Sequence, residues 1–258
     1  MMWHESGGTG DRTVLLLHGA GATAAVWNGV RQALDARGTI RWLVADLSGH
    51  GESDWQPLYG VGQLAADTAP LLRNAAEVFV VGHSLGAYVG LALASRWFGI
   101  AVRGVLAVGP KVTWSASDLE AARDLAARPI RWYATEPEAL ARYRRVSGLD
   151  PGIAPAAASL ARGVVQGEEG WRLAQDPRSF AAAGAPFASL LKAAAARVVL
   201  ARGEHDSLVS CAELAAHAAP VHTVAGAGHN VHVEQPGAMV ALLERLIEDA
   251  ALDARPQV

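Results

Sequence analysis

The chain has 258 residues, of which 51% are hydrophobic and 18% charged, so it is long and apolar enough for one globular domain with an inserted subdomain, and it is not a disordered chain. Its net charge of −3, without a long basic run, gives no electrostatic argument for binding nucleic acid or an anionic membrane. The single cysteine, Cys211, cannot form a disulfide within the chain. Neither a secretory signal nor an uninterrupted apolar run of about 18 residues is visible, so we expect a cytoplasmic protein without a membrane-spanning helix.

Strand and helix patterns alternate over the first 109 residues. A short edge strand is expected at 2–5, and the glycine-rich turn at 7–10 closes it. Short apolar runs then predict buried strands, and apolar residues at helical spacing predict helices between them. The strands are expected at 13–17, 40–45, 78–81 and 103–109, and the helices at 24–37, 61–76 and 87–98.

The alternation stops between Pro110 and Ala196 and then resumes. Within this stretch Ser117…Glu120 and Thr135…Glu138 resemble capping boxes, each at the start of a helix, and a third helix is predicted at 156–165. Beyond it we expect strands at 197–201 and 221–224 and helices at 211–218 and 236–250.

Repeated strand–helix units predict an α/β fold, with a mostly parallel sheet that carries helices on both faces. The irregular stretch predicts an insertion. We therefore expect a core formed by residues 1–111 and 191–258, and a helical cap formed by 112–190. The cap should lie over the carboxyl ends of the strands, where ligands bind in such sheets.

The central strand leads into the pentapeptide Gly82-His83-Ser84-Leu85-Gly86, which fits the pattern G-x-S-x-G. The pentapeptide alone is weak evidence, but here a strand precedes it and a helix follows it. This context predicts a nucleophile elbow, in which Ser84 sits on a strained turn and the two glycines remove side chains that would collide. The following helix points its positive end at the serine.

An acid and a base follow the elbow in the order Ser84…Asp206…His229. Asp206 lies just beyond the predicted strand 197–201, and His229 just beyond 221–224. All three residues therefore lie at the carboxyl ends of strands and can converge. His232 competes with His229 as the base, but we favour His229 because only it directly follows the small-residue loop that closes a strand. Glu204 competes with Asp206 as the acid, and we favour Asp206 by its position in the motif.

The other histidines and the tryptophans are better explained by packing. His18, His50 and His83 are expected to be structural residues of loops, and with His205 they lack the compact spacing of a metal site, so no metal is expected. Trp27, Trp114, Trp132 and Trp171 are mainly packing residues, of which one or two line the pocket.

In these motifs the chain resembles the α/β-hydrolase superfamily over nearly its whole length. The matching motifs are His18-Gly19, Asp46 to Asp54, the elbow, Gly203 to Asp206, and Gly228-His229 running on to Pro236. The resemblance implies that Ser84 is the nucleophile, His229 the base and Asp206 its orienting acid. It also implies an oxyanion hole made by the backbone N–H groups of Ala20 and Leu85.

Two features depart from the family pattern. The N-terminus is too short for the usual first strand, so we expect the sheet to lack one edge strand. The inserted block carries no family signature. Some members place the acid after an earlier strand, but here that position reads Gly109-Pro110-Lys111 and offers no carboxylate.

The expected function is that of a cofactor-free serine hydrolase, which cleaves a small carboxylic ester, lactone or thioester through an acyl-enzyme on Ser84. The alternatives are carbon–carbon bond hydrolysis of a diketone by the same triad, and a small-molecule receptor on the same fold. Lys111 and Trp114 are candidate pocket residues. Lys111 is either an ordinary solvated lysine or a cation that holds an anionic group of the substrate. The expected partner is a small-molecule substrate, and the oligomeric state is left open.

Overall fold

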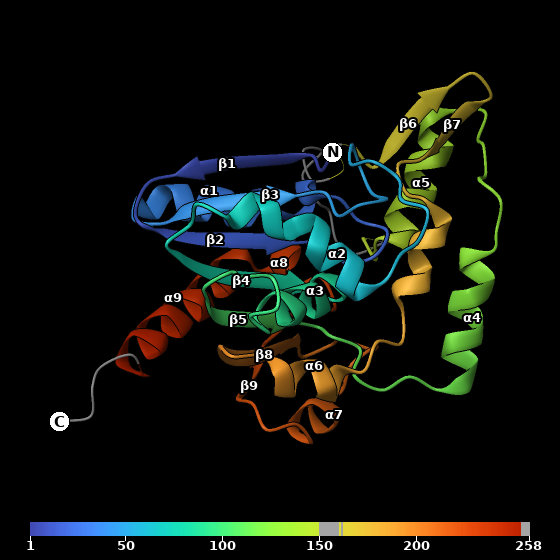
Figure 1. The fold of residues 1–258 in the computed structure, drawn as a ribbon. Helices are drawn as coiled ribbons and strands as arrows, with labels where there is room; N and C mark the ends of the chain where they lie inside the picture. Colours follow the sequence, from blue (N-terminus) through green and yellow to red (C-terminus); the bar gives the residue numbers. More distant parts are fainter. Residues whose placement is uncertain (150–159, 161, 254–258) are drawn as a thin grey trace.

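A computed structural model describes residues 1–149, 160 and 162–253, and a sheet of seven strands runs through their centre (Figure 1). The strand order is β1-β3-β2-β4-β5-β8-β9, and every neighbouring pair is parallel except β1 with β3. The strands are β1 (His4–Gly8), β2 (Arg12–Leu17), β3 (Arg41–Ala45), β4 (Glu77–His83), β5 (Val102–Val108), β8 (Arg197–Gly203) and β9 (Val221–Val224). The predicted mostly parallel sheet is confirmed. The edge strand expected at 2–5 is shifted to β1, and residues 1–3 precede it without forming a strand.

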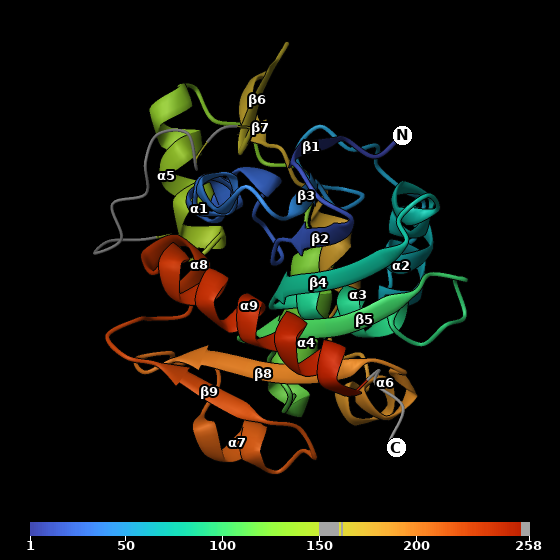
Figure 2. The ribbon, with the colours of Figure 1, turned by 90° about the vertical axis from the view of Figure 1, so that its left-hand side faces the viewer.

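Helices cover both faces of this sheet (Figure 2). One face carries α1 (Asn28–Arg37), α8 (Val231–Glu234) and α9 (Pro236–Asp253), and the other carries α2 (Val61–Thr68), α3 (Leu85–Leu93) and α6 (Phe187–Ala193). The central strands are therefore buried on both sides. In β2, Leu15 packs into one hydrophobic cluster and Leu16 into the other, as the two-residue period of a strand requires.

Some predicted helices have different bounds. The helix expected at 24–37 begins as a 3₁₀ turn, η1 (Ala24–Trp27), and the one expected at 61–76 ends in another, η2 (Ala69–Leu72). Pro70 lies in the second turn and cannot donate a hydrogen bond to continue the α-helix. The helix expected at 87–98 is α3, which starts directly after Ser84 and ends at Leu93, and α7 (Cys211–Ala215) is shorter than predicted.

Residues 112–190 carry α4 (Ala116–Ala126), α5 (Glu136–Val146), β6 (Val164–Gly167), β7 (Gly170–Leu173) and the 3₁₀ helix η4 (Pro177–Ala182). Figure 1 shows α4, α5 and the β6–β7 pair together beyond one end of the sheet. We call these residues the inserted segment. The start of α6, at Phe187, also falls within this range, but α6 packs on α3 of the core.

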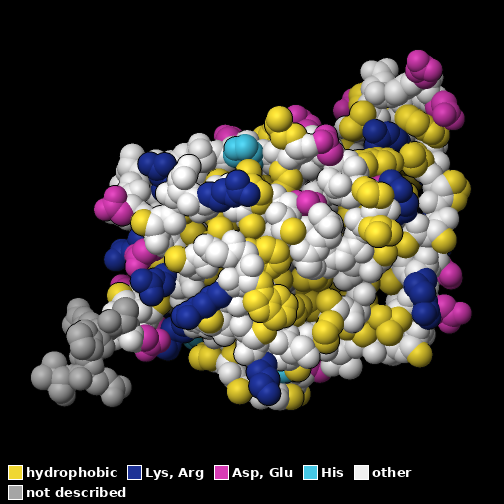
Figure 3. Space-filling view, viewed as in Figure 1, with side chains coloured by type: hydrophobic (Ala, Val, Ile, Leu, Met, Phe, Trp, Pro, Cys, Tyr) yellow, Lys and Arg dark blue, Asp and Glu magenta, His cyan; other side chains and the backbone are white. Residues whose placement is uncertain are grey.

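Figure 3 shows the face of the molecule that is seen in Figure 1. Basic and acidic side chains are scattered among apolar ones on it, without a continuous basic surface.

Neither of the two capping boxes predicted within the inserted segment is present as predicted. Ser115, and not Ser117, caps α4, because its hydroxyl accepts the Asp118 N–H while the Asp118 carboxylate accepts the Ser115 N–H. Thr135 does precede α5, but its side chain makes no capping bond.

The helix predicted at 156–165 fails at its end, because Val164 and Val165 belong to β6, which pairs antiparallel with β7. Val164 and Val165 are β-branched, and Gly170, directly after the turn at 168–169, has a φ of +116° that suits glycine. Both features favour this hairpin over a helix. Residues 156–159 and 161 of the predicted helix lie outside the described residues.

Among the helices of the described residues, none is long and apolar enough to cross a membrane.

Candidate active site

Ser84 occupies a strained turn between β4 and α3. Its φ of +49° and ψ of −111° lie where residues other than glycine are rarely found. Holding a serine in this conformation costs about 1–3 kcal/mol. The Ser84 N–H donates to the Val108 carbonyl of β5 at 2.8 Å, so the neighbouring strand helps to hold this conformation. The predicted elbow is therefore present: strand, strained serine, helix.

The two glycines of the elbow allow the backbone to pack closely. A Cβ atom at Gly82 would overlap the Gly86 carbonyl, and one at Gly86 would overlap the Leu17 carbonyl. These obstacles are backbone atoms that cannot rotate away. Any larger residue would therefore push α3 away from β2 and β4 and displace the serine.

Asp206 and His229 meet at the carboxyl ends of β8 and β9. His229 Nδ1 donates to Asp206 Oδ2 at 2.9 Å, and the other carboxylate oxygen accepts the Leu208 N–H at 2.9 Å. Asp206 is buried, with 6% of its surface exposed. The carboxylate of the alternative acid, Glu204, is exposed, and within the described residues it accepts a hydrogen bond only from the Gly226 N–H. Of the two candidate acids, Asp206 is the one bonded to His229.

His232, the alternative base, lies elsewhere. Its ring is fully buried and packs between Trp27 and His83, with ring centroids 4.4 Å and 4.5 Å away. Neither of its ring nitrogens has a hydrogen-bond partner among the described residues. Burial lowers the pKa of His232 to about 3, so the ring is neutral at physiological pH. Of the two histidines, only His229 contacts the acid.

The other buried histidines support the loops around the site. The Leu47 N–H donates to His18 Nε2 at 2.9 Å, so the proton of His18 is on Nδ1, which donates to the Gly19 carbonyl. His83 Nε2 donates to the His229 carbonyl at 3.1 Å. Burial lowers the pKa of both His18 and His83, which agrees with the structural role predicted for them. Within the described residues, no group of three His, Cys, Asp or Glu side chains could hold a metal ion.

A pocket of about 270 Å³ opens beside these groups, and we call it the serine pocket. Ser84 and His229 line it together with Ala20 and Leu85, whose N–H groups are the expected oxyanion donors. The Leu85 N–H is the first of α3 and has no partner within the helix. The inserted segment supplies much of the remaining wall, mainly with apolar side chains, namely Trp114, Ala121, Ala122, Leu125, Phe180, Ala182 and Ala183.

Lys111 and Trp114, the candidate pocket residues, both line the serine pocket. Lys111 Nζ lies 3.0 Å from Asp118 Oδ1 and 5.2 Å from the centre of the Trp114 ring. The Tyr88 hydroxyl donates to the Lys111 carbonyl and accepts from Trp114 Nε1. Hydrogen bonds from Ser115 and then Lys111 lower the pKa of Asp118 to about 2, so the ammonium faces a carboxylate across most of the pH range. The sequence did not indicate this ion pair.

Arg202 is a further residue that the sequence did not indicate. Its guanidinium is buried at the end of β8 and donates to the carbonyls of Val209, Glu204 and Asp206 at 2.7, 3.1 and 3.0 Å. These three bonds hold the loop that carries Asp206. An arginine in a strand has no local signature of this role, because its partners are backbone atoms of a loop that the sequence alone does not shape.

The chain is also similar to known proteins in sequence. Residues 14–242 match the model of the alpha/beta hydrolase family. An esterase of Mycobacterium tuberculosis is 30% identical over 265 aligned positions, which cover 94% of this chain and 84% of the esterase. Uncharacterised proteins of Mycobacterium tuberculosis and Mycobacterium bovis are 38% identical over 87 residues, and the chain matches only 25% of their length.

Solved structures resemble the whole chain. An E-2-(acetamidomethylene)succinate hydrolase superposes with a TM-score of 0.78 and is 25% identical, with 95% of this chain and 94% of that one covered. A thioesterase domain from the curacin biosynthetic pathway gives a TM-score of 0.74 at 22% identity, over 93% and 94% of the two chains, and shows the shared fold. The family match extends over most of the chain and contains Ser84, Asp206 and His229, and the chain is thus a member of the alpha/beta hydrolase family.

Proposed function

We propose that this protein is a serine hydrolase of carboxylic esters that uses no cofactor. The hydrogen bond of 2.9 Å between His229 and Asp206, beside Ser84 in one pocket, carries this proposal. The similarity to an esterase along nearly the whole chain supports ester hydrolysis as the reaction class. The proposed partner is a small-molecule substrate that reaches the serine pocket.

The proposed reaction passes through an acyl-enzyme. Ser84 Oγ attacks the ester carbonyl while His229 Nε2 takes its proton, and Asp206 keeps the imidazole in the tautomer that can accept it. The N–H groups of Ala20 and Leu85 stabilise the oxyanion, and such donors typically contribute about 10²–10³ in rate each. His229 then protonates the leaving alcohol. A water molecule, deprotonated by His229, releases the acid and restores Ser84.

The serine pocket restricts the substrate class. Its volume of about 270 Å³ is small for a ligand site, and its wall is mainly apolar. We therefore propose that a small acyl or alcohol group occupies it, from an ester, a lactone or a thioester. Thioesters are included because the same nucleophile and oxyanion donors act on them, and a solved thioesterase domain shares the fold.

A substrate panel tests the proposal. p-Nitrophenyl esters, lactones, thioesters and one dienone diketone are assayed with the wild type, with Ser84→Ala and with Ser189→Ala, which removes an exposed hydroxyl of α6. We expect repeated turnover of an ester or thioester that Ser84→Ala abolishes and Ser189→Ala retains. Turnover of the diketone alone would assign carbon–carbon bond hydrolysis instead. Release of one product molecule or fewer per chain would favour a receptor.

A further inference from the structure

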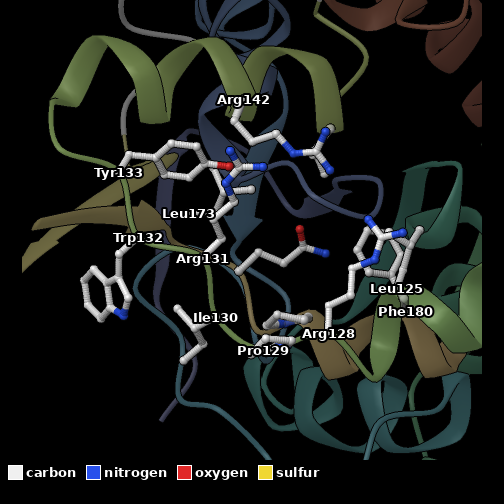
Figure 4. A pocket seen from close by; sticks show the side chains of 13 residues that line it. Leu125, Arg128, Pro129, Ile130, Arg131, Trp132, Tyr133, Arg142, Leu173 and Phe180 are labelled. Atoms are coloured by element: carbon white, nitrogen blue, oxygen red, sulfur yellow. The ribbon is translucent and has the colours of Figure 1, made fainter. Parts of the chain in front are cut away.

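A second, larger cavity lies in the inserted segment (Figure 4). Its volume is about 510 Å³, and we call it the arginine cavity because Arg128, Arg131 and Arg142 line it. Arg142 comes from α5, while Arg128 and Arg131 lie on the connection that follows α4, and Figure 4 shows the three side chains around one space. No aspartate or glutamate is among the residues that line this cavity.

The three guanidinium groups carry charge that the protein leaves uncompensated. Within the described residues, none of them has an ion pair with a carboxylate, and Arg131 instead lies 5.1 Å from the centre of the Tyr133 ring. Glu138 borders an adjacent hollow with Arg131 and Arg142 but pairs with neither. Other arginines of the chain are paired, such as Arg178 with Asp176 at 2.7 Å. Three unpaired arginines around one concave space favour an anionic ligand.

The arginine cavity adjoins the serine pocket. The side chains of Leu125 and Phe180 line both, so they form a common wall. Gln175 of the arginine cavity donates to the Ser179 hydroxyl of the serine pocket at 3.0 Å.

The loop that contains Ala20 and Gly21 also borders both spaces. Ala20 lines the serine pocket, and a Cβ atom at its neighbour Gly21 would overlap the side chain of Val146, which lines the arginine cavity. The two spaces are therefore neighbours, bordered by the same side chains and by adjacent residues of one loop.

We infer that the substrate is an ester or thioester with an anionic group, a phosphate or a carboxylate, at the end remote from the scissile bond. This inference rests on the proposed function. The serine pocket holds the reacting end, and Arg128, Arg131 and Arg142 bind the remote anion. Planar guanidinium groups suit this task, because each presents paired N–H donors that match two oxygens of a phosphate or a carboxylate. Arg128 and Arg131 are exposed, so such an anion can reach them from solvent.

The test compares matched substrates. Methyl esters of straight-chain acids of increasing length are prepared with a terminal methyl group, a terminal carboxylate or a terminal phosphate. We measure kcat/KM for each with the wild type, with Arg128→Gln/Arg142→Gln, and with Arg123→Gln, an exposed arginine of α4 that lines neither cavity. The quantity of interest is the ratio of kcat/KM for the anionic ester to that for the neutral ester of equal length.

We expect this ratio to rise with chain length to about tenfold or more in the wild type, as charge-assisted hydrogen bonds imply. It should fall close to one in the double variant and stay at the wild-type value in Arg123→Gln. An equal ratio in the wild type and the double variant would overturn the inference. The inference would also be overturned if the cavity binds a free anion that acts as an effector. In that case, added inorganic phosphate would change the rates for neutral and anionic esters by the same factor.

A binding measurement separates this inference from the proposed reaction. The free acids of the series that end in a carboxylate or a phosphate are titrated by calorimetry into Ser84→Ala. The same titrations are made with the triple variant Ser84→Ala/Arg128→Gln/Arg142→Gln. Weaker binding of the acids in the variant that lacks both arginines supports the anion site even if no ester of the series is hydrolysed. Unchanged binding refutes it even if Ser84 proves to be the nucleophile.

Discussion

Exchanging Asp206 for asparagine tests how the acid controls the base. The carboxylate uses both oxygens, one for His229 Nδ1 and one for the Leu208 N–H, each at 2.9 Å. An amide has a single oxygen, and turning its NH₂ group toward the Leu208 N–H would leave that donor unpaired at a cost of about 1–3 kcal/mol. The amide oxygen of Asp206→Asn therefore faces Leu208, and its NH₂ group faces His229.

The imidazole must then accept at Nδ1 and carry its proton on Nε2, where it cannot take the proton of Ser84. We expect kcat to fall by about 10⁴, the effect of a wrong tautomer in such a triad. The melting temperature should change little, because two hydrogen bonds are replaced by two. The assay is hydrolysis of p-nitrophenyl acetate, with Glu204→Gln in the same loop as the control. More than about a tenth of the wild-type kcat in Asp206→Asn would refute this reasoning.

Further predictions concern packing, acid stability and charge at the pocket rim. Gly86→Ala should destabilise the fold by about 1–3 kcal/mol, because its Cβ meets backbone carbonyls, whereas Gly62→Ala in α2 meets no atom and should raise the melting temperature. The pKa of His232 is about 3 in the folded protein and 6.5 in the unfolded chain. Between pH 3 and 6.5 only the unfolded chain binds this proton, so stability falls as the pH decreases from about 6.5 to 3. His232→Leu should reduce that slope by up to about 1.4 kcal/mol per pH unit in urea unfolding, and an unchanged slope would contradict the burial argument. Lys111→Met should raise KM for an ester with a free carboxylate relative to its methylated form. Asp118→Asn, which frees the Lys111 ammonium, should lower that relative KM. Shifts of KM in the same direction in the two variants would exclude charge recognition by this pair.

The core fold could be predicted from the sequence because its signals are local. Short apolar runs such as Val78–Val81 are bounded by glycine or polar residues, and a parallel sheet gathers the loops after its strands at one edge. That rule predicts that Ser84, Asp206 and His229 lie near one another. The preference for His229 over His232 also follows from the sequence, because only His229 directly follows the small-residue loop that closes a strand. The structure adds the difference in their burial and partners.

The inserted segment was predicted less well, because its features depend on tertiary contacts. The β6–β7 hairpin interrupts a stretch that composition alone favours as helical. The pairing of Lys111 with Asp118 follows from where α4 packs, and the bonds of Arg202 follow from how the Asp206 loop folds back. The arginine cavity joins residues from 125 to 180 that no sequence motif links.

Whether Ser84 is the nucleophile is tested most directly by identifying the residue that an organophosphate modifies. A fluorophosphonate is incubated with the native protein, and the intact mass and the digested peptides are measured. We expect one adduct per chain, on the peptide that contains Ser84, with activity lost in proportion to labelling and no adduct on Ser84→Ala. An adduct on a different serine, or full activity in a chain labelled at Ser84, would contradict this expectation.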